Sequence, residues 1–244
     1  MANGIYTAVS GAVAQTQVLD VVANNVANLG TTGFKSDGIA FAEVLAQTAA
    51  KGDPSGGGQV QLAETRIDMR PGALRQTGNP LDVALEGKGF MALREGNEVL
   101  YTRGGAFRLT EEGNLIDPAG RMVLDDRSQP IQIPEGEEKL RIASDGTIQG
   151  KGGPIGTIRL VEFARPELLQ RAGATLFVPQ AGMTPEKAAA TKVHQGYIET
   201  SNVNPVQGMT SLITASRAYE AFHRIISTFQ TVDRKAATNL GDNG

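Results

Sequence analysis

The sequence contains no cysteine and no tryptophan, and it has only two histidines. Without cysteine, the chain can form neither a disulfide framework nor a thiolate metal site. Its two histidines, His194 and His223, lie far apart with no third ligand pattern near either, which argues against a zinc site. The formal net charge is −3 and no basic stripe is present, so we expect no nucleic acid partner.

Two kinds of targeting segment are also missing from the sequence. No apolar run approaches the length needed to span a bilayer. The first residues do not combine a charged stretch with a compact apolar stretch, so they do not resemble an ordinary secretory signal. We therefore expect a protein that carries no cleaved signal peptide.

The motifs that usually carry catalysis are absent as well. Asp125 and Asp126 resemble a catalytic carboxylate pair, but the following Arg127 and Ser128 favour a solvated turn there. The glycines of 87–89 lack the third glycine of a dinucleotide site, and the glycine run at 56–58 is not followed by the Lys-Ser/Thr of a phosphate loop. The sequence thus predicts no enzyme activity, no cofactor, no metal and no small-molecule substrate.

The N-terminal 30 residues, in contrast, have a clear helical pattern. Two lines of positions repeat every seven residues, one with Ile5, Ala12, Leu19 and Val26, the other with Ala8, Gln15, Val22 and Leu29. This is coiled-coil spacing, and Gly30 and Gly33 supply the backbone freedom to end the helix. The only charge before Lys35 is Asp20, while amides such as Asn24, Asn25 and Asn28 occupy the other faces. Such a neutral face suits a helix surrounded by protein, although a disordered neutral tail is the alternative.

The C-terminal region predicts a second long helix. Asn204 is a natural N-cap and Pro205 suits the first helical position. Beyond them, apolar residues again repeat every seven positions, with Leu212, Tyr219 and Ile226 on one line and Ala215, Phe222, Phe229 and Ala236 on the other. Neither helix can bury its stripe alone, so we expect the two terminal helices to pair as a coiled coil.

The middle of the chain has the pattern of a β protein. Leu81, Val83 and Leu85 alternate with polar or small residues and predict a strand with one buried face. Glycine turns then follow at short intervals, which favours antiparallel strands in a meander. The expected core comprises Phe90, Tyr101, Phe107, Leu109, Leu115, Met122 and Leu124. The pattern further predicts a short helix at 166–170, a last strand at 176–178 and an irregular return through 184–192. The fold class is therefore α+β, with paired terminal helices and a central antiparallel β-rich domain.

The segment that links the first helix to the β region is less regular. Phe34, Ile39, Phe41, Val44 and Leu45 form a small apolar set that could anchor it, with a helical turn or two at 43–48. A glycine-rich stretch at 51–58 then predicts a flexible surface loop.

Three runs of the sequence resemble the signatures of one protein family. The first motif is NNVAN at 24–28 with TTGFK at 31–35, the central motif is YTRGGAF at 101–107 with GNL at 113–115, and the last motif is QGYIETSNVN at 195–204. In this order they resemble the signatures of bacterial flagellar rod and hook proteins. The resemblance spans nearly the whole chain, and Ala106 departs from the asparagine common at that position.

The resemblance implies a structural subunit of the flagellar basal-body rod, an axial drive shaft that transmits torque across the periplasm. Residues 1–30 and 200–244 would form the inner helical domain, 31–70 a connecting segment and 71–199 an outer β-rich domain. The implied partners are copies of the chain and other rod subunits in a helical tube, together with the flagellar export apparatus. The implied assembly interface comprises Leu19, Val22, Asn24, Asn25, Val26, Asn28, Gly33, Phe34, Asn202, Asn204, Leu212, Tyr219, Phe222, Ile226 and Phe229.

Two alternatives remain open at this stage. Within the family, the run RIDMRPGALRQTG at 66–78 and the short connecting segment resemble proximal-rod members more than distal-rod members. From another class, a β-rich surface-binding module with a coiled-coil stalk would share the same pattern of elements. A secretory signal is expected for such a module and is not seen.

Overall fold

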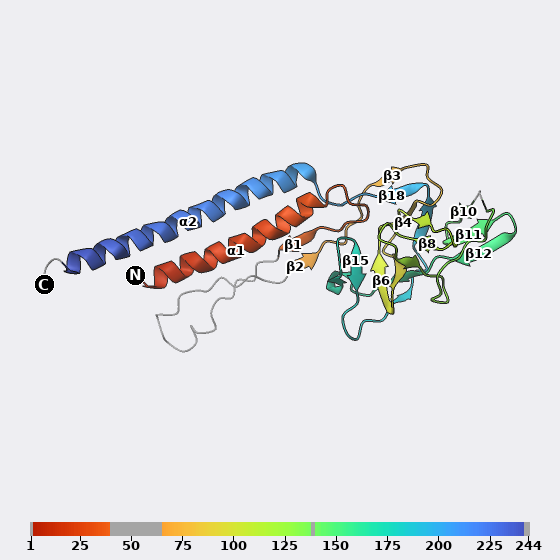
Figure 1. Ribbon diagram of the computed structural model, residues 1–244, viewed down its shortest axis with the longest axis horizontal. Helices are drawn as coiled ribbons and strands as arrows, with labels where there is room; N and C mark the ends of the chain where they lie inside the picture. The colour runs from red at the N-terminus through yellow and green to blue at the C-terminus, as the bar shows by residue number, and fades with distance from the viewer. Residues whose placement is uncertain (1, 40–64, 138–139, 242–244) are drawn as a thin grey trace. The chain divides into compact units, whose positions relative to one another are not determined.

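The computed structural model of the protein describes residues 2–39, 65–137 and 140–241 (Figure 1). The chain divides into two compact units. The helical unit comprises residues 1–27, 37–66 and 204–244, and the β unit comprises residues 28–36 and 67–203. The expectations for Phe41, Val44, Leu45, the helical turns at 43–48 and the loop at 51–58 fall outside the described residues.

The helical unit is built on α1 (Ala2–Ala27) and α2 (Pro205–Gly241), which lie side by side (Figure 1). The predicted cap of α2 is confirmed, since Asn204 Oδ1 accepts hydrogen bonds from the N–H groups of Val206 and Gln207 at 3.0 and 3.1 Å. The first helix ends at Ala27, slightly earlier than expected, because Asn28 begins a turn. Its carbonyl accepts the Thr31 N–H at 3.2 Å and its side chain accepts the Thr31 hydroxyl at 3.0 Å.

Small residues let α1 and α2 approach closely. A Cβ atom built on Gly11 would lie 2.5 Å from Cε1 of Phe222, so a larger residue would require that ring to shift. Further along, Gln15 Nε2 donates to the carbonyl of Ala215 at 3.3 Å. Ala8, Ala12 and Ala215 are buried. As residue numbers rise along α1 the facing residues fall along α2, so the helices run antiparallel.

A two-stranded sheet follows α1 in the helical unit. It pairs β1 (Asp37–Ile39) with β2 (Thr65–Ile67). The Asn25 side chain holds the start of β1, because its Oδ1 accepts the Asp37 N–H and its Nδ2 donates to the Asp37 carbonyl, each at 2.9 Å. The amide of Asn25 is therefore satisfied within its own chain.

The β unit contains short strands whose pairings are all antiparallel. The nine-stranded sheet has the order β14-β15-β6-β5-β9-β8-β7, with β13 on β5 and β16 on β13. Smaller sheets are β10-β11-β12, β17-β4 and β18-β3. The strands are β3 (Leu74–Gln76), β4 (Val83–Glu86), β5 (Phe90–Glu95), β6 (Glu98–Thr102), β7 (Arg108–Leu109), β8 (Leu115–Ile116), β9 (Met122–Val123), β10 (Arg141–Ile142), β11 (Thr147–Gly150), β12 (Gly153–Thr157), β13 (Leu160–Glu162), β14 (Gln170–Arg171), β15 (Leu176–Val178), β16 (Glu186–Lys187), β17 (Lys192–Gln195) and β18 (Tyr197–Glu199).

Two apolar clusters fill the β unit. The larger gathers aliphatic residues from many strands, among them Val83, Leu93 and Ile148. The second is aromatic, with Phe90 edge-on to Phe177 at a centroid distance of 5.7 Å and Tyr101 edge-on to Phe163 at 5.0 Å. Of the expected core, Phe90, Tyr101, Phe107, Leu115 and Leu124 are confirmed as buried.

Several local expectations were wrong. Leu109 and Met122 are 36% and 38% exposed, because they lie on two-residue strands near one edge of the large sheet. The strand β4 is buried on both faces, because Ala84 is as inaccessible as Val83 and Leu85. A strand enclosed on both faces does not show the one-sided pattern that we expected.

The end of the β unit also differs from expectation. The expected short helix at 166–170 is present as a 3-10 helix that covers only Pro166–Leu168. Leu176–Val178 is a strand but not the last one, because β16, β17 and β18 follow it. These strands are short and mostly polar, and each is defined by a distant partner strand, β13, β4 and β3 respectively. Their own residues therefore give no β pattern.

Candidate functional site: a buried junction of the three motifs

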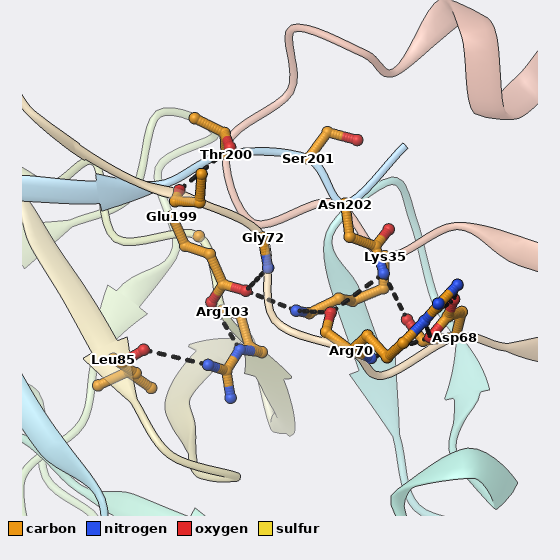
Figure 2. A network of polar contacts seen from close by, with 12 residues as sticks. Lys35, Asp68, Arg70, Gly72, Leu85, Arg103, Glu199, Thr200, Ser201 and Asn202 are labelled. Carbon is orange, nitrogen blue, oxygen red and sulfur yellow. Dashed lines mark hydrogen bonds and ion pairs between the residues drawn. The ribbon is translucent and has the colours of Figure 1, made fainter. Parts of the chain in front are cut away.

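One residue from each of the three motifs meets the other two inside the β unit (Figure 2). Lys35 Nζ lies 2.5 Å from Glu199 Oε1, and Arg103 Nε lies 2.7 Å from Glu199 Oε2. The three residues are almost wholly buried, with exposed fractions of 0% for Lys35, 3% for Arg103 and 0% for Glu199. We call these three residues and the groups bonded to them the junction.

The positive charge of Arg103 is compensated in part by backbone carbonyls. The guanidinium of Arg103 donates to the carbonyls of Gly89 at 2.7 Å, Gly87 at 3.0 Å and Leu85 at 3.1 Å. These oxygens lie around the end of β4 and the turn that follows it. Arg103 therefore fixes that turn while its charge is balanced by Glu199, as a buried ion pair requires.

Lys35 and Glu199 complete their hydrogen bonds with the segment at 70–72. Lys35 Nζ donates to the Arg70 carbonyl at 2.8 Å, and the Gly72 N–H donates to Glu199 Oε1 at 2.8 Å. Burial lowers the pKa of Lys35 below its ordinary value, and the nearby Glu199 carboxylate opposes that shift. Lys35, Glu199 and the backbone groups of Arg70 and Gly72 therefore form one hydrogen-bonded network.

Asn202 ties the same segments together beside the ion cluster (Figure 2). Its Oδ1 accepts the Ser36 N–H at 2.8 Å, and its Nδ2 donates to the carbonyls of Asp68 at 2.8 Å and Arg70 at 3.1 Å. Its backbone N–H donates to the Phe34 carbonyl at 3.3 Å. Through its backbone and its side chain, Asn202 of the last motif thus joins the end of the first motif to the start of the segment that precedes β3.

Close backbone approach explains the glycines of these motifs. Gly33 has φ +74, and a Cβ atom there would lie 2.3 Å from the backbone nitrogen of Gly104 in the central motif. A Cβ atom on Gly72 would lie 1.9 Å from the Thr200 carbonyl oxygen. Larger residues at either position would force the motifs apart.

Arg171 on β14 adds a contact from outside the three motifs. Its guanidinium lies 4.8 Å from the centroid of the Phe34 ring and 5.7 Å from that of Phe177. It also donates to the carbonyl of Lys35. Arg171 therefore links the first motif to the edge of the large sheet.

The structure places the predicted interface residues in three settings. Gly33, Phe34 and Asn202 are brought together at the junction, while Asn28 forms the turn after α1. Asn25 holds β1 and Asn204 caps α2. The others lie along the two helices: Leu19, Val22, Asn24 and Val26 on α1, and Leu212, Tyr219, Phe222, Ile226 and Phe229 on α2. Their role in assembly remains a prediction.

Sequence reasoning missed the charged centre of the junction. Lys35, Arg103 and Glu199 all lie within the quoted motifs, but none was singled out. The available signal was that each is a charged residue in a run that is otherwise almost uncharged. A single charged residue within an uncharged stretch of sequence indicates a buried side chain that is paired within the protein, because exposed charges do not require an uncharged stretch around them.

The described residues offer no metal site of the usual kind, since no group of three or more His, Asp or Glu side chains gathers among them. Within the same ranges, neither helix has the length and apolar character needed to cross a membrane.

Comparison with known proteins matches three family models to this chain. The model described as flagella basal body rod protein matches residues 5–35, the one for the flagellar hook protein FlgE/F/G D1 domain matches 84–150, and the one for the flagellar basal body rod FlgEFG protein C-terminal matches 194–240. Together they contain all three junction residues.

Full-length relatives agree with these models. The chain is 32% identical to the flagellar basal-body rod protein FlgF of Mesorhizobium japonicum, over 99% of both chains. It is 31% identical to the FlgG protein of Bacillus subtilis and 34% identical to that of Caulobacter vibrioides, in each case over 93% of this chain and 95% of the relative.

Proposed function

The chain belongs to the family of flagellar basal-body rod proteins, and on that premise we propose that it is a proximal-rod subunit that carries torque. Its role is structural, because it would hold a place in a shaft rather than transform a substrate. The rod lies in the periplasm, and the partners are copies of this chain and neighbouring rod subunits in a helical tube with a central channel.

The junction is the observation that carries this proposal. The chain passes between its two units after residues 27, 36 and 66 and before residue 204. Inside the β unit, the segments next to the last three of these crossings are bonded to one another through Ser36, Asp68 and Asn202. A force applied to either terminal helix would therefore reach all three segments through short hydrogen bonds and buried ion pairs.

The terminal helices would form the inner layer of the tube as a coiled coil. The seven-residue repeat along both helices and the close contact of Gly11 with Phe222 support this pairing. The stripe residues of α2, such as Tyr219, Phe222 and Phe229, are only partly buried against α1. The remaining apolar surface is available to neighbouring subunits.

A proximal position is supported by length as well as by the run at 66–78. The FlgF relatives from Mesorhizobium japonicum and Caulobacter vibrioides each align over 99% of both chains. The FlgG relative from Caulobacter vibrioides aligns over 93% of this chain, yet its identity is 34%, which keeps a distal position as the second candidate.

Imaging of purified basal bodies separates the two positions. The chain would carry a peptide tag in its exposed turn at Gly152, and a gold-labelled antibody would locate the tag along the rod. We expect label at the end of the rod nearest the inner membrane. Label confined to the outer end would support the distal position, and absence of label from the whole rod would overturn the proposal.

We further propose that the chain reaches the periplasm through the flagellum's own export apparatus. The family's place beyond the inner membrane supports this route. Cells that lack the export gate should then contain no periplasmic copy of the chain, and mass spectrometry of the assembled protein should find its first residues intact. Periplasmic protein with a cleaved N-terminus in those cells would instead indicate the general secretory route.

A further inference from the structure

Asn202 uses both ends of its side-chain amide on two different chain segments. The oxygen accepts from Ser36, the last residue of the β unit before the chain crosses to β1. The nitrogen donates to Asp68, which follows the return crossing after residue 66. Asn202 itself lies just before the crossing to α2. Figure 2 shows Asn202 beside Lys35, Asp68 and Arg70.

We propose that Asn202 is a positioning residue that sets the path of the chain at three of its four crossings. The inference rests on the proposed role in torque transmission, because only a shaft subunit needs this path to be held under load. Its role differs from that of Glu199, which forms ion pairs with the buried cations Lys35 and Arg103. Asn202 carries no charge and orders backbone groups alone.

An amide is the group that these contacts require. Asn offers one acceptor and two donors on a short side chain, and here all three functions are used. Aspartate has the same shape but would present a second oxygen to the carbonyls of Asp68 and Arg70, which accept at 2.8 and 3.1 Å. The substitution Asn202→Asp therefore removes two bonds and adds repulsion without changing volume.

The same motif supplies a matched control in Asn204. Its side chain uses only the oxygen, which accepts from Val206 and Gln207 at the start of α2. Aspartate caps helices about as well as asparagine. Asn204→Asp therefore makes the identical chemical change two residues away and should be tolerated.

Hydrogen exchange on the purified full-length chain tests the proposal without reference to the flagellum. In Asn202→Asp, the Asp68 amide, which donates to the Ser36 carbonyl beside the two lost bonds, should exchange at least about tenfold faster than in the parent chain, while the Ser36 amide keeps an acceptor oxygen. In Asn202→Ala the Ser36 amide loses that acceptor and should be accelerated as well. Amides of β5 should keep their parent rates, and Asn204→Asp should leave both regions unchanged. Parent rates at Asp68 in Asn202→Asp, or equal acceleration by Asn202→Asp and Asn204→Asp, would overturn the proposal.

A second variant and a second readout complete the test. If Asn202→Asp does not accumulate, Asn202→Ala removes all three side-chain bonds without adding charge, and the Ser36 and Asp68 amides are both followed. In cells, the Asn202 variant should build rods in normal number but lose swimming speed more steeply than Asn204→Asp as viscosity rises. Equal speed loss with fast local exchange would overturn the torque-transmission role while leaving the positioning role intact.

Discussion

The helical unit and the β unit bury their apolar residues to very different degrees. In the β unit, large side chains such as Phe34, Phe90 and Leu93 are inaccessible to solvent. On the helices, Val206 is 75% exposed, and Met209 and Ile213 one and two turns later are more than half exposed. The β unit closes its core with its own residues, whereas the helices keep an apolar surface that a single chain does not cover. A subunit whose role is to assemble would need both properties.

The helical unit and the β unit should differ most in the hydrogen-exchange rates of their amides, measured on the isolated monomer. Amides at 2–29 and 206–240 should exchange fast, because a pair of helices that buries little surface is marginal in water. Amides within 80–165 should be protected up to the free energy of global unfolding, roughly 5–15 kcal/mol. Mass spectrometry of exchanged peptides measures both. Slow exchange across both helices in a proven monomer would remove the distinction between the units.

A charge on the α2 stripe should act on assembly alone. Phe222→Asp and Phe229→Asp each place a carboxylate on the apolar stripe of α2, the expected packing seam, at a cost of several kcal/mol if the carboxylate is buried in the rod. We expect no incorporation into basal bodies and an unchanged circular dichroism spectrum of the β unit. Thr228→Asp, at an exposed position of the same helix, is the control. Normal motility of the double mutant would show that the seam lies elsewhere.

Loss of the junction carboxylate should act on the β unit alone. Glu199→Gln leaves Lys35 and Arg103 as two buried cations without a counterion, and we expect the free energy of unfolding to fall by about 3–5 kcal/mol. Chemical denaturation followed by tyrosine fluorescence measures it. Glu98→Gln on the exposed part of β6 should change it little. A loss below about 1 kcal/mol in Glu199→Gln would mean that the cluster is not a closed ionic network.

The smallest expected effect is the dependence of folding stability on pH. The hydrogen bond from Arg70 lowers the pKa of Asp68, and the backbone N–H of Thr147 lowers the pKa of Asp145, both below the ordinary value of 3.8. These carboxylates therefore stabilise the folded chain above pH 3.8, and the contribution is lost as pH falls through their folded pKa values.

Unfolding curves at several pH values test this effect. Asp145→Asn should reduce the loss of stability between about pH 5 and about pH 2.5, because it removes one of the two titrations. The same loss in the variant and the parent would exclude Asp145 as a source. Lys35 acts in the same direction at higher pH: because burial lowers its folded pKa, stability rises with pH between that folded value and the ordinary value of 10.5.

The helices could be predicted from sequence because their signals are local. The seven-residue repeats, the Asn204 cap and Pro205 all act within one or two turns of chain. The core aromatics of β5 and β6 could be found in the same way, from apolar residues between glycine turns. The strand β17 could not, since it is defined by its pairing with β4 more than 100 residues earlier in the chain, as His194 opposite Ala84 shows.

The junction could be predicted only in part, for the same reason. Gly33 was expected to end a helix, and the structure adds that it lies against Gly104 in the central motif. The quoted motifs contain Lys35, Arg103 and Glu199, but nothing in the spacing of three charges indicates that they meet. Contacts of this kind follow from the tertiary fold and not from any local pattern.

The separation of the junction residues along the sequence also determines the order in which they become available for folding. Lys35 and Glu199 are 164 residues apart. A chain that emerges with its N-terminus first presents Lys35 and Arg103 long before it presents the carboxylate that both need. Until Glu199 appears, burial of the two cations is unfavourable, so a partly emerged chain has no stable route to the native β unit. The last motif is thus the event that completes folding, and it arrives just ahead of α2.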